Sequence, residues 1–186
     1  MQTATQDPEG TYEQGDGSKF SYDRFFDASK NWYQIATNSR PETSIVNKVL
    51  NRATTCENVV AHYSKGPDGV ISYVNYCYLQ GKRNPSLDRT GRLIPQSLDV
   101  PFFHMKDSKT GKEVPFNVAV TDYDNFAIVT DRGKYFWILS RKTSICSNAF
   151  HYITNKLVSK GYNVSSITLD LRAMKHCDEK GGEVEK

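Results

Sequence analysis

Three short stretches decide the fold of this chain: NWYQIA at 31–36, TDYDNFAIV at 121–129 and WILSR at 137–141. Each is rich in the aromatic and β-branched residues that strands favour. The third stretch ends on Arg141, at the point where its apolar run stops. The three segments are widely spaced, so β structure is expected through most of the chain.

Further strand patterns lie between these stretches. The clearest is a hairpin in which 58–64 and 70–79 flank Gly66-Pro67-Asp68-Gly69, a turn of residues that fix or free φ. Tight turns between successive strands predict an up-and-down antiparallel order. The expected strands are 31–37, 58–64, 70–79, a short one within 81–95, 98–102, 116–121, 126–130, 135–141 and 164–171.

One amphipathic helix is expected after the last long strand. Thr143 or Ser144 can cap it, and Gly161 is placed to end it. Its apolar face, which predicts docking against the outside of a sheet, comprises Cys146, Phe150, Ile153 and Leu157.

Composition excludes several classes of protein. The 24 basic and 21 acidic residues give a net charge of +3, and the basic residues are scattered, so no nucleic-acid partner is expected. No apolar run reaches the length of about 18 residues that a membrane span needs. His62, His104, His151 and His176 show no zinc-binding spacing, so no metal site is expected.

The three opening stretches, in this order, resemble the three signature regions of the lipocalins. The resemblance implies an all-β, eight-stranded antiparallel up-and-down barrel with one C-terminal α-helix packed outside. It places Trp32 at the closed end with Arg141 across it, and Thr121, Asp122 and Tyr123 in the second motif. The expected division is a flexible segment 1–18, a barrel domain 19–178 and a flexible tail 179–186.

The entry to the first strand departs from the family pattern. Lys30 stands two residues before Trp32, where the family usually has a glycine that permits a tight turn. The turn must therefore be built differently here. Just before it, Phe20, Tyr22, Phe25 and Phe26 form an aromatic cluster that could cross the closed end as a short helix and plug it.

The resemblance implies a secreted carrier with no reaction of its own, which binds a small hydrophobic ligand inside its barrel. Ligands left open are a bilin pigment, a retinoid, a fatty acid, a steroid and a biogenic amine, with a bilin chromophore as the first expectation. Strand alternation, with the phase set by Arg141, assigns an aromatic lining with a few polar groups. The predicted ligand-binding residues are Tyr73, Phe102, His104, Phe116, Val118, Tyr135 and Trp137, and the same alternation points Val100 and Val120 inward and leaves Asn75 as a further candidate.

Two other functions stay open. A lipocalin-type isomerase uses a free cysteine near the place of Cys56, but the acidic neighbour Glu57 opposes formation of a thiolate. A packed barrel could alternatively bind another protein through its loops. The sequence also leaves a homo-oligomer open.

The placement of the cysteines bears on whether the protein is secreted. The first twenty residues lack the apolar segment of a signal peptide, so a secreted protein would have lost its leader. In insect bilin-binding and apolipoprotein D-like lipocalins, cysteines placed like Cys56 and Cys177 form a disulfide, which leaves Cys77 and Cys146 as a second, doubtful pair. Four cysteines in this placement favour secretion. Asn163-Val164-Ser165 matches a glycosylation sequon.

Overall fold

Eight antiparallel strands close into a ring in this protein. The computed structural model describes residues 19–38, 57–79, 81–96, 100–165, 167–169 and 174–175. The eight strands of the ring are β1 (Trp32–Thr37), β2 (Glu57–Lys65), β3 (Ile71–Leu79), β5 (Arg89–Pro95), β6 (Phe102–Asp107), β7 (Glu113–Thr121), β8 (Phe126–Thr130) and β9 (Phe136–Ser140).

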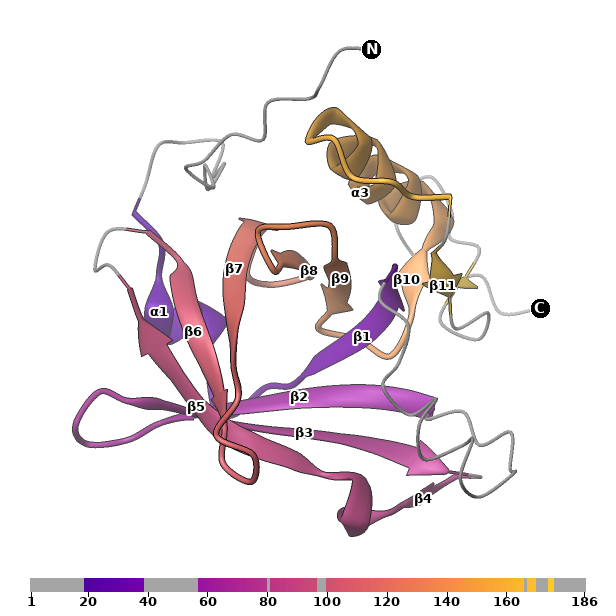
Figure 1. The fold of residues 1–186 in the computed structure, drawn as a ribbon. Coiled ribbons are helices and arrows are strands. Elements are labelled where there is room, and N and C mark those ends of the chain that lie inside the picture. The colour runs from indigo at the N-terminus through magenta and orange to yellow at the C-terminus, as the bar shows by residue number, and fades with distance from the viewer. Residues whose placement is uncertain are drawn as a thin grey trace.

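Each of these strands pairs with its neighbour in chain order, and β1 pairs with β9 to close the ring. Figure 1 shows the curved wall that results, with α1 (Tyr22–Phe25) against one end of it. The expected eight-stranded barrel with an external helix is therefore confirmed. Three short elements flank the ring: β4 (Lys82–Arg83) pairs with β3, β11 (Thr168–Leu169) pairs with β1, and η1 (Pro85–Leu87) precedes β5.

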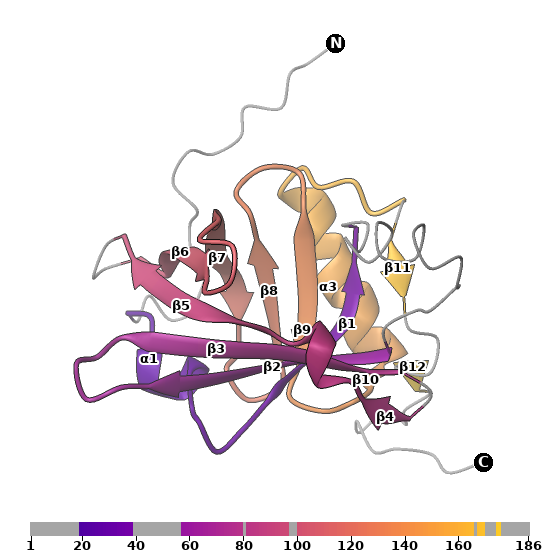
Figure 2. The same cartoon turned by 60° about the horizontal axis from the view of Figure 1, so that its bottom comes forward.

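The helix α3 (Ser147–Ser159) lies outside the ring, beside β1 and β9 (Figure 2). Its buried residues Ile153 and Leu157 join an outer cluster that shields the exterior of β1, β7, β8 and β9 from water. The cluster also contains Ile35, Ala36, Ala119, Val120, Ile128, Phe136, Ile138 and Ile145.

The start of α3 differs from the expectation, and its end agrees. A cap at Thr143 or Ser144 is wrong, because Ile145 and Cys146 form β10, which pairs in parallel with β12 (Met174–Lys175). The helix begins only after Cys146, which makes no side-chain capping bond. Gly161 ends the helix as predicted, with a φ of 84° that suits glycine.

A second, inner cluster fills the ring. Its buried members are Phe20, Phe25, Phe26, Trp32, Tyr63, Ile71, Tyr73, Leu93, Phe103, Phe116, Val118, Tyr123, Ala127, Val129 and Leu139. Because successive side chains of a strand point to opposite faces, the two clusters divide β1, β7, β8 and β9 between the barrel interior and the surface under α3.

The expected inward face of β7 is wrong at Val120. The pairing of β7 with β8 shifts register between Val118 and Val120, which inserts one residue and changes the alternation. Val118 therefore faces the interior, whereas Ala119 and Val120 both pack in the outer cluster under α3.

The cysteine expectations fall partly outside the described residues. Cys56 and Cys177 lie outside them. Cys77 and Cys146 are both disulfide-bonded. Cys77 is buried on the same face of β3 as Tyr73, whereas Cys146 immediately precedes α3, and no bond between these two is observed. The doubtful second pair is therefore not observed, and the Cys56–Cys177 pair implied by the resemblance, which requires it in a chain of four cysteines, is not supported.

The chain ends, 1–18 and 176–186, also lie outside the described residues, so the expected domain limits stay a prediction. No helix in the described ranges is long and apolar enough to cross a membrane.

Candidate functional site

An aromatic cluster closes one end of the ring. The segment around α1 brings Phe25 and Phe26 into the interior, where both are buried. The Phe25 ring lies 5.1 Å from Trp32, and the Phe26 ring lies 5.4 Å from Phe103 and 5.2 Å from Tyr63, measured between centroids. The edge-to-face and tilted contacts are typical of favourable aromatic packing. The expected plug at the closed end is confirmed.

Arg141 covers this closed end from β9. Its guanidinium carbon is 3.6 Å from the centroid of the Trp32 ring, and its nitrogens donate to the backbone oxygens of Tyr123, Asn31, Arg24 and Phe25 at 2.8–3.4 Å. Burial lowers the pKa of Arg141 to about 10. The position implied for Trp32 and Arg141 is therefore observed.

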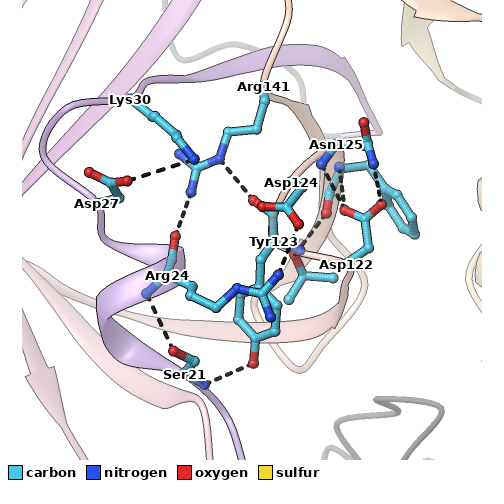
Figure 3. Close-up of polar contacts among 11 residues, drawn as sticks. Ser21, Arg24, Asp27, Lys30, Asp122, Tyr123, Asp124, Asn125 and Arg141 are labelled. Atoms are coloured by element: carbon cyan, nitrogen blue, oxygen red, sulfur yellow. Dashed lines mark hydrogen bonds and ion pairs between the residues drawn. The ribbon is translucent and has the colours of Figure 1, made fainter.

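The turn between β7 and β8 fastens α1 to the ring (Figure 3). Asp122 accepts hydrogen bonds from the backbone of Asn125 and Phe126, and Thr121 accepts one from the backbone N–H of Tyr123. These bonds hold Tyr123 at a φ of 67°, and its hydroxyl accepts a hydrogen bond from the N–H of Ser21 at 2.8 Å. The second motif is therefore structural.

The entry turn before β1 uses hydrogen bonds in place of a glycine. Asp27 accepts bonds from both the backbone N–H and the hydroxyl of Ser29, at 2.9 and 2.7 Å. The Lys30 N–H donates to the carbonyl of Asp27. The hydrogen bonds from Ser29 lower the pKa of Asp27. In this chain, hydrogen bonds from a side chain to the backbone stabilise the tight turn that glycine permits in the family pattern.

On four of the strands, a buried inward-facing side chain near the closed end is followed, two residues farther from α1, by one that is partly exposed or exposed. On β9, Leu139 is buried and Trp137 is partly exposed, and on β6, Phe103 is buried and Met105 is partly exposed. The same change separates Tyr73 from Asn75 on β3 and Phe116 from Val114 on β7. The interior is therefore packed shut at the α1 end and reached by solvent farther along.

Four of the seven predicted lining residues lie in or against the inner cluster: Tyr73, Phe116, Val118 and Trp137. Tyr135 precedes β9 and lies in the β8–β9 turn, where the Lys134 ammonium is 4.9 Å from its ring centroid. Its expected place on the inner face of the last strand is not observed, because that strand begins at Phe136.

The predicted inward orientation of Phe102 and His104 is wrong. The buried inward residue of β6 is Phe103, so its two neighbours face outward. The Phe102 ring contacts the Arg132 guanidinium at 4.4 Å, and His104 Nδ1 lies 3.5 Å from a Glu113 carboxylate oxygen. Val100, expected inward as well, is 42% exposed. β6 runs from Phe102 to Asp107, and its alternation turns Phe103 and Met105 inward instead.

Sequence reasoning missed Tyr63, which lies in the interior between the plug and Tyr73. Its ring contacts Phe26 and Phe116, and β2 places it directly opposite Tyr73. The hairpin turn at 66–69 fixes this pairing, so the signal was present in the sequence.

Gly91 makes the position of Tyr73 possible. The two residues are partners across β3 and β5. A Cβ at Gly91 would lie 2.7 Å from the Tyr73 hydroxyl oxygen and 1.9 Å from the carbonyl oxygen of Lys106. Only a residue without a side chain lets the tyrosine ring lie against β5 at this point.

Known proteins share this architecture. A family model described as a lipocalin-like domain matches residues 29–171. The solved structure of insecticyanin from the tobacco hornworm Manduca sexta has a TM-score of 0.57 at 19% identity, covering 86% of this chain and 86% of that one.

Two further solved structures give similar values. Lobster apocrustacyanin A1 has a TM-score of 0.55 at 17% identity, covering 82% of this chain and 87% of that one. The allergen Per a 4 from cockroaches has a TM-score of 0.52 at 15% identity, covering 81% and 87%. No curated protein sequence matches the chain significantly.

Proposed function

This chain belongs to the lipocalin family, and we propose that it is a secreted carrier that binds a small hydrophobic ligand inside its barrel. The observation that carries the proposal is the solvent-reached part of an apolar interior. Trp137 and Met105 pack against the inner cluster and remain partly exposed. Aromatic and thioether side chains in this setting favour a flat apolar molecule.

Burial of the ligand's apolar surface would supply most of the binding free energy, at about 25 cal/mol per Å². The closed end gives the ligand a fixed floor, because the buried Phe26 ring contacts both Tyr63 and Phe103 there. A conjugated ligand such as a bilin pigment or a retinoid suits this aromatic interior better than a flexible chain does. A bilin therefore remains the first candidate.

We propose no catalytic activity for the barrel. The polar side chains of the closed end are engaged in turns and in fastening α1, as the Asp122 and Tyr123 contacts illustrate. The alternative isomerase depends on Cys56, which lies outside the described residues. A free thiol at Cys56 in the purified protein would favour the isomerase.

The direct test is ligand binding to the purified protein. An absorption spectrum of material from the native source should show a visible band if the ligand is a pigment. In parallel, a bilin, a retinoid and a fatty acid are added to the recombinant protein. The class that is carried should raise the melting temperature, since a hundredfold excess over Kd stabilises the folded state by about 2.7 kcal/mol.

A matched pair of variants locates the site. Met105→Trp adds bulk to the inner face and should abolish the ligand-induced shift. Val158→Trp makes a comparable change at a position on α3 that is 55% exposed, and should leave the shift intact. If Met105→Trp binds every ligand as the wild type does, the ligand does not enter the ring.

A further inference from the structure

Three polar groups on the inner wall formed by β2 and β3 lack hydrogen-bond partners. Tyr63 and Tyr73 are both 3% exposed, and within the described part of the chain neither hydroxyl makes a hydrogen bond. The Asn75 Oδ1 atom is fully buried and also has no partner among those residues. Of these three groups, Asn75 Oδ1 is itself a buried unpaired atom, and because buried polar atoms are nearly always paired it calls for an explanation.

These groups form one continuous patch on the wall. Tyr63 is directly opposite Tyr73 across the two strands, and Asn75 follows two residues later, opposite Ala61. Side chains two apart on a strand share a face, and Ala61 packs against the inner cluster. The patch therefore extends from the aromatic floor at Tyr63 toward the solvent-reached part at Asn75.

Both tyrosines are held as neutral hydrogen-bond donors. Burial raises the pKa of the Tyr63 phenol and of the Tyr73 phenol. The negative charge of Asp107 raises the pKa of Tyr73 further, against a smaller opposing effect of Arg89. The local potential beside Tyr73 thus disfavours an anion, and a neutral acceptor is the better partner for its hydroxyl.

The absence of a side chain at Gly91 leaves space for the Tyr73 ring. Gly91 leaves the space that the ring occupies, since any Cβ there would approach the hydroxyl oxygen to 2.7 Å. Because Gly91 has no side chain, the backbone itself leaves room for the Tyr73 hydroxyl. The position of this hydroxyl is therefore a feature of the fold.

Building on the proposed carrier function, we infer that the ligand has a neutral carbonyl group with an adjacent N–H, as in an amide or lactam, and that this group binds the Tyr63–Tyr73–Asn75 wall. The two phenols donate to the carbonyl oxygen. Rotation of the Asn75 amide turns Oδ1 to the interior, where it accepts from the N–H. The polar end of the ligand therefore lies deep within the ring and not at its rim.

Three flat probes of similar size test this inference. They are 2-naphthamide, which has the carbonyl and N–H, 2-naphthoate, which is an anion, and 2-isopropylnaphthalene, which is a hydrocarbon of the same shape. Affinities are measured by titration calorimetry. The amide should bind the wild type about 10-fold more tightly than either of the others, as expected for two or more hydrogen bonds made without a charge.

Tyr63→Phe and Tyr73→Phe should each weaken amide binding by about 3- to 10-fold and leave the affinity for the hydrocarbon unchanged. Neither should lower the melting temperature of the free protein, because each removes a hydroxyl that has no partner there. Loss of affinity without loss of stability distinguishes a binding role from a structural one. Tyr33→Phe, on the outer face of β1, is the matched control and should change neither affinity.

The outcomes separate this inference from the proposed function. If the hydrocarbon binds as tightly as the amide and the two phenylalanine variants have no effect, the ring carries apolar ligands but the polar wall does not select them. A preference for 2-naphthoate would contradict the neutral ligand. Should none of the three probes bind, both the inference and the carrier function for flat ligands are overturned.

Discussion

The guanidinium of Arg141 lies over Trp32, with its central carbon 3.6 Å from the ring centroid, while its nitrogens donate hydrogen bonds to four backbone carbonyls. Trp32 is fully buried and donates its indole N–H to the carbonyl of Phe25 at 3.0 Å. The pair joins β1, β9 and the α1 segment at one point. The pair therefore holds the closed end of the barrel together, and it lies away from the part of the interior that solvent reaches.

Replacement of Trp32 by alanine should destabilise the protein by about 3–5 kcal/mol, as large aromatic truncations in cores do. The variant loses the contact with Phe25 and leaves that residue's carbonyl with one donor fewer. Urea unfolding followed by circular dichroism measures the change. A full wild-type midpoint would show that this end of the barrel does not depend on the tryptophan.

Arg141→Ala should destabilise by about 2–4 kcal/mol, because four backbone carbonyl groups, three of them in part-buried contacts, lose charge-assisted donors. Arg24→Ala is the comparison. Arg24 forms a 2.9 Å ion pair with Asp124, but the two side chains are 50% and 61% exposed, so its loss should be below about 1 kcal/mol. Equal effects of the two substitutions would contradict the special position of Arg141.

Gly91→Ala should lower stability by about 1–3 kcal/mol through overpacking. The new Cβ would meet the Lys106 carbonyl at 1.9 Å, and backbone cannot move aside as a flexible side chain can. Gly66→Ala is the control, since its nearest neighbour is the movable carboxylate of Asp68. Thermal unfolding of both variants makes the comparison, and a larger loss in the control would refute this packing.

Alkaline pH should destabilise the protein through Tyr63. Its ordinary pKa is 10.0, and burial raises the pKa in the folded state above that value. Above about pH 10 the unfolded chain therefore loses a proton that the folded chain keeps, so stability falls as the pH rises. Tyr63→Phe should flatten this fall by up to about 1.4 kcal/mol per pH unit between pH 10 and 11. Parallel wild-type and variant curves would contradict the shift.

The fold followed from the sequence because its main signals are local or carried by motifs. Alternation and the 66–69 turn predicted the long strands, and the spacing of Ile153 and Leu157 predicted the docking face of α3. The resemblance added the closure at Trp32 and Arg141. These signals do not depend on the phase of any single strand.

The interior was harder to predict because one residue of offset exchanges the two faces of a strand. In the expected strand 98–102 the inward face was given to Val100 and Phe102, whereas Phe103 holds that place in β6. The bulge after Val118 has no obvious sequence mark, and Val120 was misplaced for that reason. The unpaired hydroxyls of Tyr63 and Tyr73 could not be foreseen, because pairing depends on the whole surrounding packing.

Ligand entry into the ring is most directly tested by the fluorescence of Trp137. This residue is partly exposed beside the inner cluster, whereas the other tryptophan, Trp32, is buried at the closed end under Arg141. A bound conjugated ligand, either bilin or retinoid, should quench the emission saturably in the wild type. The saturable quenching should fall sharply in Trp137→Phe, which retains only Trp32. Quenching that is unchanged in Trp137→Phe, or absent from the wild type with every ligand class, would contradict a ligand site inside the barrel.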